Sequence, residues 1–418
     1  MDEHRRPGWH DVTGHRRWLL EEATRLLCFY LPRVLDPDGG FHELGVDGAP
    51  QVVEERSVVT TARMVHSFSL AHLLGYPGAG PLADHGLRFL QSHHRDRTHG
   101  GYDWIAGRDG PIDASKTAYG HAHVLLAASS ALAADRPGAP ELMASIGEII
   151  DERFWSDAEG RSVEEYGADW TGPSPYRGQN SNMHLTEALM AAYEVTGERR
   201  HLERARSIAR HLIQEAAAEN GWRVPEHYDQ EWRMDREYHR DEPEHPYRPY
   251  GTTVGHSLEW ARLLLQLRAL LGDNERWMLD ASRQLFQRAV DDGWVADRGG
   301  FVYTLDYDGR PLKCDRFWWV MAEAIGAASF LLRVTKDLAY ERWYRTFWDW
   351  TELHLIDRER GGWFSVLDPE LRLKERPWGG KNDLYHALQA CLVPLLPTDH
   401  GLAVGLRSGL LRLEPAAS

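Results

Sequence analysis

The chain has 418 residues, of which 42% are hydrophobic and 27% charged, a composition typical of a globular protein with a substantial core. Its formal net charge is −15, from 63 acidic and 48 basic side chains. This charge argues against nucleic acid as a main partner, because a phosphate-binding surface needs an excess of lysine and arginine. The sequence shows no apolar leader and no apolar run of the roughly 18 residues that a membrane span needs. We therefore expect a soluble cytoplasmic protein without a membrane partner.

Amphipathic segments alternate with glycine-centred turns along the chain. In these segments apolar residues recur at spacings of three and four, the period of an α-helix. In chain order, the expected helices span residues 60–75, 81–94, 118–134, 180–196, 203–219, 254–265, 322–334 and 382–390. The turns centre on Gly40, Gly101, Gly160, Gly221, Gly300 and Gly362. Because glycine adopts positive φ without steric cost, we assign these glycines to the scaffold.

The spacing of the turns indicates an internal repeat. Two helices recur about six times with a period near 60 residues, which is longer than the roughly 34 to 47 residues of most open helical solenoids. Six such hairpins favour an all-α fold, a closed (α/α)6 barrel with one helix of each pair inside and one outside. An open superhelix is the alternative. We expect residues 1–418 to form one catalytic domain of this kind.

One polar or aromatic residue interrupts the apolar pattern near the start of the second helix of every unit. These residues are Arg56, Tyr119, His184, His256, Trp319 and His386. In a barrel, the equivalent ends of the inner helices converge on one mouth, so we predict that all six line a single pocket. Several also have a partner three or four residues away on the same helical face. These pairs are Asn180 with His184, His256 with Glu259, Trp319 with Glu323, and Asp383 with His386.

Each pair taken alone is typical of a helix cap or a surface contact. Their common phase in successive repeats favours the walls of a shared cavity. Histidines are well suited to moving protons near neutral pH, and the carboxylates can orient imidazoles or bind hydroxyl groups. Arg56 could polarise a carbonyl oxygen. Trp318 and Trp319 offer a flat apolar wall for a sugar ring.

The sequence lacks motifs for metals and cofactors. No single segment carries a compact set of histidines and carboxylates, and neither a phosphate-binding loop nor a dinucleotide-binding glycine fingerprint occurs. Cys28, Cys314 and Cys391 form no C-x-x-C pair, and three thiols make a poor disulfide framework. We predict no metal, no cofactor and three thiols buried in the core.

Four stretches in order resemble the N-acylglucosamine 2-epimerase superfamily, most closely its D-mannose isomerase and sulfoquinovose isomerase branch. They are RGQNSNMHLTEALMAAYEVTG at 177–197, GHSLEWARLLL at 255–265, WWVMAEA at 318–324 and KNDLYHALQACLVPLLP at 381–397. The resemblance extends over nearly the whole chain. It implies an (α/α)6 barrel and metal-independent interconversion of an aldose and a ketose through a cis-enediol.

The resemblance also implies roles for individual residues. His256 and His386 are expected to be the paired acid and base. Asp383 is expected to be the acidic partner of His386, with Asn382 as the alternative. The residues expected to bind sugar hydroxyls or shape the pocket are Arg56, Tyr119, Asn180, His184, Glu259, Trp318, Trp319 and Glu323.

The longest interval between turns, from Gly221 to Gly300, contains a charged, aromatic and proline-bearing insert at about 222–253. Long loops in compact domains are usually functional or disordered. Because this insert directly precedes His256, we expect it to form a lid over the mouth that selects substrate and limits water. A solvated excursion without a role is the alternative.

We expect interconversion of D-mannose and D-fructose, with D-lyxose and D-xylulose as a second pair, by a monomer or homodimer. A 2-epimerase acting on D-mannose and D-glucose or on N-acyl-D-glucosamine is the nearest alternative, because the proton then returns to C2 from the opposite face instead of to C1. Sulfoquinovose is a further candidate, with Arg248 as a sulfonate ligand. A glycoside hydrolase on the same barrel would need a carboxylate pair across the scissile bond. A non-catalytic helical scaffold is the remaining class.

Overall fold

The computed structural model describes residues 8–375 and 379–413. Helices predominate in it, and the strands are two or three residues long. The α-helices are α1 (Thr13–Tyr30), α2 (Val58–Leu73), α3 (Ala79–Phe89), α4 (Ala118–Ala133), α5 (Ala139–Ile149), α6 (Gln179–Thr196), α7 (Arg199–Ala209), α8 (Val254–Leu270), α9 (Arg276–Gly293), α10 (Trp318–Thr335), α11 (Leu338–His354), α12 (Leu384–Leu392) and α13 (Leu402–Arg407). Shorter helical turns are η1 (Trp9–Asp11), η2 (Leu90–His94), η3 (Ile150–Phe154), η4 (Arg210–Ala217) and η5 (Val393–Leu395).

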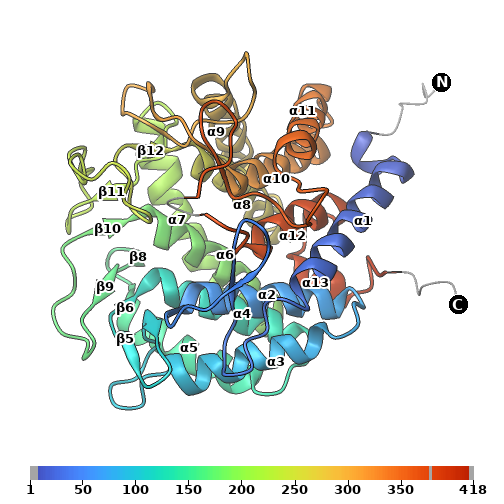
Figure 1. Cartoon of the computed structure of the whole chain (residues 1–418). Coiled ribbons are helices and arrows are strands. Elements are labelled where there is room, and N and C mark those ends of the chain that lie inside the picture. Colours follow the sequence, from blue (N-terminus) through green and yellow to red (C-terminus); the bar gives the residue numbers. More distant parts are fainter. Residues whose placement is uncertain (1–7, 376–378, 414–418) are drawn as a thin grey trace, which may run out of the picture.

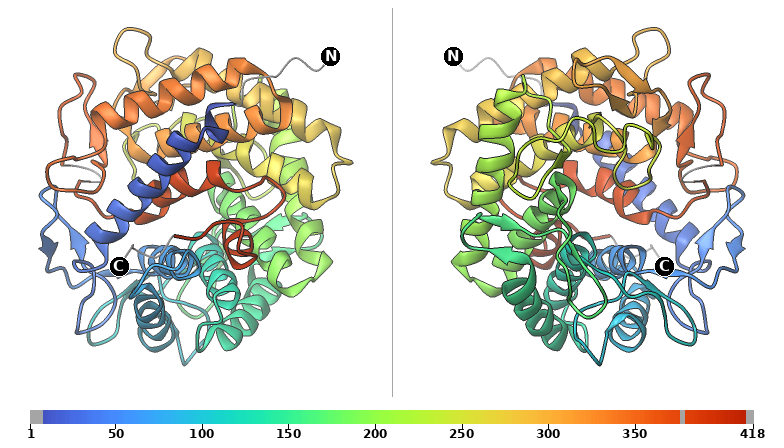
Figure 2. Two further views of the ribbon diagram at one scale, coloured as in Figure 1. Left: turned by 90° about the vertical axis from the view of Figure 1, so that its right-hand side faces the viewer. Right: turned by 90° about the vertical axis from the view of Figure 1, so that its left-hand side faces the viewer.

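Two concentric rings of helices make up the molecule. In the inner ring α2, α4, α6, α8, α10 and α12 each pack against the next, and α12 packs back against α2. In the outer ring α3, α5, α7, α9 and α11 each cover the inner helix that precedes them, and α1 covers α12. Figure 2 shows the ring from both ends. The predicted closed (α/α)6 barrel is confirmed, and the open superhelix is not.

The first and last parts of the chain close the barrel together. The N-terminal helix α1 supplies the outer partner of α12, the last inner helix. The backbone N–H of Leu44 donates to the Oδ1 atom of Asn382 at 2.5 Å, and the N–H of Lys381 donates to the carbonyl oxygen of Leu44 at 2.9 Å. Hydrogen bonds between the first and last repeats thus complete the ring.

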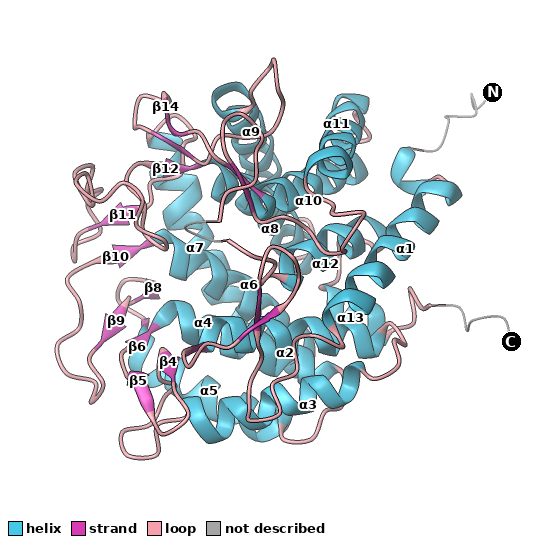
Figure 3. Cartoon of the chain, in the orientation of Figure 1, coloured by secondary structure: helices cyan, strands magenta, loops and turns pink. Residues whose placement is uncertain are grey.

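Short antiparallel ladders hold the starts of the inner helices. The strands β3, β6, β10, β12 and β15 each end directly before an inner helix and pair with β4, β9, β11, β13 and β16, which follow the next glycine turn. The strands are β1 (Glu43–Leu44), β2 (Pro50–Gln51), β3 (Arg56–Ser57), β4 (Ile105–Ala106), β5 (Pro111–Asp113), β6 (Lys116–Thr117), β7 (Trp155–Ser156), β8 (Arg161–Ser162), β9 (Glu165–Tyr166), β10 (Arg177–Gly178), β11 (His227–Tyr228), β12 (Thr252–Thr253), β13 (Thr304–Leu305), β14 (Pro311–Lys313), β15 (Arg316–Phe317) and β16 (Val366–Leu367). Figure 3 shows several of them along one side of the barrel. Strands this short carry no alternation signal, so the sequence predicted helices alone.

The turn glycines adopt the conformation that the sequence predicted. Gly40, Gly101, Gly160, Gly221, Gly300 and Gly362 all have positive φ, between 64 and 78 degrees. At Gly101 a Cβ atom would also lie 2.6 Å from the ring of Trp170. Both the backbone conformation and the close packing therefore require glycine there.

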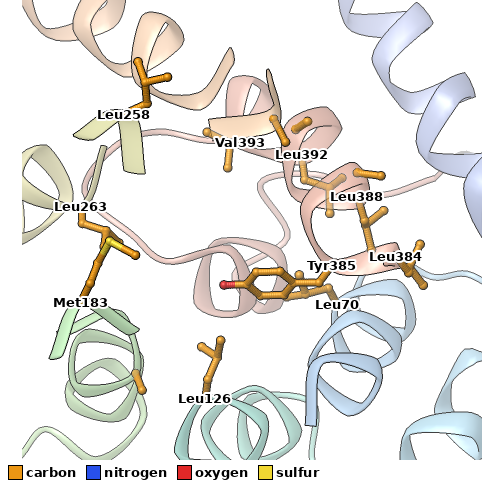
Figure 4. Packing of buried hydrophobic residues seen from close by; sticks show 14 of the residues in the cluster. Leu70, Leu126, Met183, Leu258, Leu263, Leu384, Tyr385, Leu388, Leu392 and Val393 are labelled. Atoms are coloured by element: carbon orange, nitrogen blue, oxygen red, sulfur yellow. The ribbon is translucent and has the colours of Figure 1, made fainter. Parts of the chain in front are cut away.

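The core lies between and inside the two rings. Figure 4 shows Leu126 of α4, Met183 of α6, Leu258 of α8 and Leu388 of α12 around the centre of the inner ring. All four side chains are at most 5% exposed. Burying one leucine side chain stabilises the fold by about 1.5–3 kcal/mol. Because the inner helices are covered on all sides, they are apolar around most of their circumference, and the polar residues at their starts need another explanation.

The two ends of the barrel differ. Most of the labelled strands lie on one side in Figure 1, and both chain termini lie on the opposite side. There α13 packs against α2, α4 and α6. None of the described helices is long and apolar enough to cross a membrane. Cys391 is buried and all three cysteines are free, but Cys28 is exposed and Cys314 only partly buried, so the prediction of three core thiols is wrong for these two.

Candidate active site

A cavity opens at the end of the barrel where the inner helices begin. Its empty space is about 1010 Å³, the open mouth included, which suits a small molecule. Nine of the eleven residues that the sequence predicted for the site line it: Tyr119, Asn180, His184, His256, Glu259, Trp318, Trp319, Asp383 and His386. The lining also includes Val59, Thr60, Arg63, Met64, Pro246, Tyr247, Pro249, Tyr303, Ser365, Asn382, Leu384 and Tyr385.

The polar residues occupy two levels of the inner helices, about one turn apart. Tyr119, Asn180 and Trp319 are the second residues of α4, α6 and α10, and His256 and His386 are the third residues of α8 and α12. The sixth residues of the six inner helices are all polar: Arg63, His123, His184, Glu259, Glu323 and Gln389. Of this lower level, Arg63, His184 and Glu259 line the cavity. The set predicted from the sequence, with one residue from each repeat, therefore mixed residues of the upper level with His184 of the lower level.

The structure does not bring Arg56 into the cavity, which corrects the sequence prediction. Arg56 is the first residue of β3, before α2 begins, and its guanidinium pairs with the carboxylate of Asp36 at 2.5 Å. Lys116, the first residue of β6, makes the same kind of pair with Asp96 at 3.0 Å. The basic residue before the helix therefore ties the strand to the segment of the preceding glycine turn.

Arg63, which the sequence reading passed over, is the arginine of the cavity. Its Nε–H donates to the Nε2 atom of His123 at 3.1 Å, and its Nη2 group donates to the hydroxyl oxygen of Tyr119 at 3.2 Å. Its guanidinium also lies 4.8 Å from the ring centroid of Tyr385. Burial lowers the pKa of Arg63, but Tyr119 and Asp383 outweigh this effect and raise it, so the group stays charged. The signal that would have found Arg63 is its place on the sixth-residue level.

His256 is held by a carboxylate from a different repeat. Its Nδ1 atom lies 2.8 and 3.0 Å from the two carboxylate oxygens of Glu226, which precedes β11. Glu226 is 3% exposed, and burial raises its pKa, but His256 outweighs this and the net shift is downward. Glu226 is therefore ionised at neutral pH. It lies in the insert, where no periodicity marks it in the sequence.

His386 has a carboxylate partner on its own helix. Its Nδ1 atom is hydrogen-bonded to the Oδ2 atom of Asp383, which also accepts from the indole N–H of Trp318 at 3.0 Å. Asp383 caps α12 by accepting from the backbone N–H of His386 at 3.1 Å. Burial raises the pKa of Asp383, yet His386 and Arg63 hold it at about 2. Asp383 rather than Asn382 is thus the residue that contacts the histidine.

The two carboxylate-paired histidines lie close to the same tryptophan. The ring centroid of Trp319 lies 5.3 Å from that of His256 and 6.0 Å from that of His386. Since each Nδ1 atom faces a carboxylate, the Nε2 atoms are the ones that can serve the cavity. Two imidazoles beside one indole in the lining form a site that can transfer protons to a small ring-shaped ligand.

The floor of the cavity is a buried charge network. The Nε atom of Arg262 lies 2.9 Å from the Oε2 atom of Glu323, and its Nη2 atom lies 3.5 Å from Glu187 and 3.9 Å from Glu259. Glu323 thus lies below the cavity as a partner of Arg262, which corrects its predicted place in the lining. Burial, and then the charges of Glu323 and Glu187, raise the pKa of Glu259 well above its usual value. The protonated form of Glu259 is therefore favoured relative to that of an exposed glutamate.

Three buried polar atoms in the lining have no hydrogen-bond partner. They are the Oδ1 atom of Asn180, the Nδ1 atom of His184 and the Oε1 atom of Glu259. An unpaired buried polar group is costly, by about 1–3 kcal/mol. Burial lowers the pKa of His184 to about 4, so this imidazole is neutral at pH 7. These atoms are suited to hydrogen bonds with ligand hydroxyl groups.

The insert contributes one wall of the mouth. Pro246, Tyr247 and Pro249 line the cavity, and the Tyr247 ring packs edge-on against Tyr119 at 5.9 Å. The insert is tied to the barrel by Arg248, whose Nη2 atom lies 2.8 Å from the Oε2 atom of Glu165 in β9.

Two groups of described residues bring three metal-ligand atoms within 4.8 Å of one another: His184 with Glu187 and Glu259, and His239 with Glu242 and His245. In the first group the guanidinium of Arg262 lies 3.5 Å from Glu187, so an arginine already supplies a positive charge to these carboxylates. In the second group both histidines use Nδ1 for backbone contacts with Arg248. The first group therefore offers one imidazole beside two carboxylates, and the two imidazoles of the second group have their Nδ1 atoms occupied.

Comparison with known proteins identifies the family. Residues 39–390 match the N-acylglucosamine 2-epimerase (GlcNAc 2-epimerase) family. The chain belongs to this family. A D-mannose isomerase of Thermobifida fusca is 46% identical over 403 residues, which cover 95% of this chain and 98% of that protein. A D-mannose isomerase of Pseudomonas cannabina pv. alisalensis is 42% identical over 99% of each chain.

Solved structures of other proteins share the fold of this chain. A crystal structure of D-mannose isomerase has a TM-score of 0.87 to this chain at 32% identity, covering 94% of this chain and 99% of the other. The cellobiose 2-epimerase of Spirochaeta thermophila DSM 6192 has a TM-score of 0.78 at 24% identity, covering 91% and 96% of the two chains, and shares the fold. The predicted family and barrel are thus confirmed.

Proposed function

We propose that this chain is a metal-independent sugar isomerase that interconverts D-mannose and D-fructose. The observation that carries the proposal is the pair of carboxylate-bound histidines beside Trp319 in one cavity, in a protein 46% and 42% identical to two D-mannose isomerases. D-lyxose and D-xylulose, which share the stereochemistry at C2 and C3, are the proposed second pair.

The chemistry needs two proton transfers between adjacent carbons and their oxygens. A base removes the proton from C2 of the open-chain aldose while O1 gains a proton, which gives a cis-enediol. The proton then returns to C1 while O2 loses one, so no atom is gained or lost overall. His256 and His386 are proposed to carry these protons through Nε2, and one of them also opens the pyranose ring. Positioned acid–base groups of this kind contribute about 10²–10⁴ in rate each.

Arg63 is proposed to stabilise the oxygen that becomes negative during enolisation, the role that the sequence assigned to Arg56. Its charge is fixed in place by Tyr119 and His123 before substrate arrives. Preorganised donors of this kind contribute about 10²–10³ in rate. Glu259 and Asn180 are proposed to bind sugar hydroxyls, and Trp319 to pack against the CH face of the sugar.

The charge of the lining favours an unphosphorylated sugar. Arg63 is the one arginine or lysine among the described residues that line the cavity, and it lies on the lower level. Arg248 reaches the mouth region, but Glu165 and Glu164 neutralise it, at 2.8 and 3.4 Å. A phosphate or sulfonate group would find no uncommitted cation there, which favours mannose over sulfoquinovose. The insert at 222–253 is proposed to act as a lid over this mouth.

Incubation of the purified protein with D-mannose, before and after treatment with a chelator, tests the proposal. Chromatography of the sugars is expected to show D-fructose at equal rates in both samples. D-glucose without D-fructose would reassign the chain to the 2-epimerases, and loss of activity with the chelator would reject metal independence.

A further inference from the structure

A closed hydrogen-bond network lies behind His256, on the side away from the cavity. Its members are Gln179 at the start of α6, Glu226 before β11, Thr253 at the end of β12 and Trp260 of α8. Gln179 and Trp260 are fully buried, and Glu226 is 3% exposed. The network therefore connects His256 to two other repeats without contact with bulk water.

The direction of each hydrogen bond follows from the one group that can only donate. The indole N–H of Trp260 donates to the Oε1 atom of Gln179 at 2.8 Å, which fixes the orientation of that amide. The Nε2 group of Gln179 must then donate, and it does so to the Oε2 atom of Glu226 at 2.8 Å. The backbone N–H of Thr253 donates to the Oε1 atom of Glu226 at 3.0 Å.

This arrangement fixes the proton of His256. Its Nδ1 atom faces both oxygens of the ionised Glu226, so a lone pair there would point at negative charge, whereas an N–H finds an acceptor. The Nε2 group of Gln179 also lies 2.8 Å from Nδ1, and one of its two hydrogens donates to Glu226. The negative charge on two carboxylate oxygens, at 2.8 and 3.0 Å, against one neutral amide group favours an N–H at Nδ1. With the proton on Nδ1, the Nε2 atom of His256 carries a lone pair and is able to accept a proton.

We propose that Glu226, oriented by Gln179 and Trp260, is the positioning residue that holds His256 in the Nδ1–H tautomer and thereby makes its Nε2 atom a base. The proposal rests on the proposed function for the catalytic role of His256, but not for the tautomer itself. Because Glu226 lies near the start of the insert at 222–253, the insert would also position His256, in addition to its proposed role as a lid. Asp383 holds His386 by the same Nδ1 contact from within one helix, so the two histidines are oriented by separate parts of the chain.

Replacement Glu226→Gln tests the proposal because it keeps the shape and removes one acceptor. The N–H groups of Gln179, Thr253 and His256 would then converge on a single amide oxygen beside a new NH₂ group. Gln179 cannot turn over, because Trp260 would then face another donor. The arrangement of lowest free energy is then the one in which the proton of His256 moves from Nδ1 to Nε2. The Nδ1 atom can then accept a hydrogen bond from the new amide. We expect kcat to fall by about 10²–10⁴-fold, as when an imidazole is held in the wrong tautomer, with KM changed less than about threefold.

The double variant Glu226→Gln/Gln179→Glu supplies the discriminating rescue. The carboxylate at position 179 accepts from Trp260, from the new amide and from His256, so every donor has an acceptor again. We expect at least a tenfold recovery of kcat relative to Glu226→Gln alone. If Glu226 had only a structural role, the losses of kcat caused by the two single replacements would be additive in the double variant. Glu194→Gln, which alters a buried carboxylate that accepts from the backbone N–H of Gly401, is the matched control and should keep wild-type kcat.

A measurement without substrate separates this inference from the proposed function. In ¹⁵N-histidine-labelled protein, the imidazole nitrogens of His256, assigned with the variant His256→Asn, are expected to show the Nδ1–H tautomer in the wild type and the Nε2–H tautomer in Glu226→Gln. An unchanged tautomer, or full activity of Glu226→Gln beside an active wild type, would overturn the inference. A wild type inactive on every sugar, with the tautomers as expected, would overturn the proposed function alone.

Discussion

His256 and His386 come from different inner helices, α8 and α12, yet both rings lie beside Trp319, with centroids 5.3 and 6.0 Å from its ring. Each uses Nδ1 to contact a buried carboxylate, Glu226 or Asp383. Proton transfer between neighbouring sugar atoms requires two such groups on one small cavity. Here each histidine has its Nδ1 atom against a carboxylate, which leaves Nε2 to carry the proton. The predictions below follow from this arrangement.

Replacement of either catalytic histidine should abolish turnover without unfolding the protein. We expect His256→Asn and His386→Asn each to lower kcat for D-mannose by at least about 10²–10⁴-fold, because no other group replaces the lost proton carrier. The melting temperature should change little, since both side chains contact the cavity. Retention of more than a tenth of kcat in either variant would remove that histidine from the mechanism.

Replacements of two arginines, Arg63 in α2 and Arg56 in β3, should separate effects on catalysis from effects on stability. Arg63→Ala should lower kcat by about 10²–10³-fold, because a fixed positive charge beside the developing oxyanion is lost. Arg56→Ala breaks the ion pair with Asp36, so it should lower the melting temperature while kcat and KM stay near wild type. Kinetics and melting curves of both variants, measured side by side, check the assignment. A reversed pattern would restore the role that the sequence gave to Arg56.

The lid proposal predicts an effect on KM. Arg248→Ala removes the contact with Glu165, so the insert should close less often and KM for D-mannose should rise by roughly tenfold, about 1.4 kcal/mol of binding free energy. Arg233→Ala, in the same insert, removes exposed pairs with Asp229 and Glu231 and is the matched control. Equal KM values for the two variants would mean that the insert is not a lid.

Glu194 should make the fold less stable as the pH rises. Burial raises its pKa to about 7, although the backbone N–H of Gly401 lowers it. A carboxyl group with a raised folded-state pKa favours folding while protonated, so this contribution is lost between about pH 4.5 and pH 7. Glu194→Gln should therefore match the wild type at pH 4.5 and exceed its free energy of unfolding by about 3 kcal/mol at pH 8. Urea unfolding of both proteins at pH 4.5 and pH 8 checks this. The same difference in free energy of unfolding between variant and wild type at both pH values would contradict it.

The sequence predicted the barrel because the glycine turns recur with a regular period and helical periodicity is strong in long segments. It also predicted most of the lining, since Tyr119, His256 and Trp319 all stand at the starts of inner helices. It failed at Arg56 because this residue belongs to β3, seven residues before Arg63, which lies on the sixth-residue level of α2. Glu226 could not be predicted, because it lies in an irregular loop and only the fold brings it to His256.

Conversion of D-mannose in ²H₂O by chelator-treated protein, followed by NMR of the products, tests the central claim most directly. Proton relay by the two histidines predicts D-fructose that carries solvent deuterium at C1, formed at the same rate with and without chelator. D-fructose that retains the original hydrogen of C2 and forms only when metal is restored, or no D-fructose at all, would contradict it.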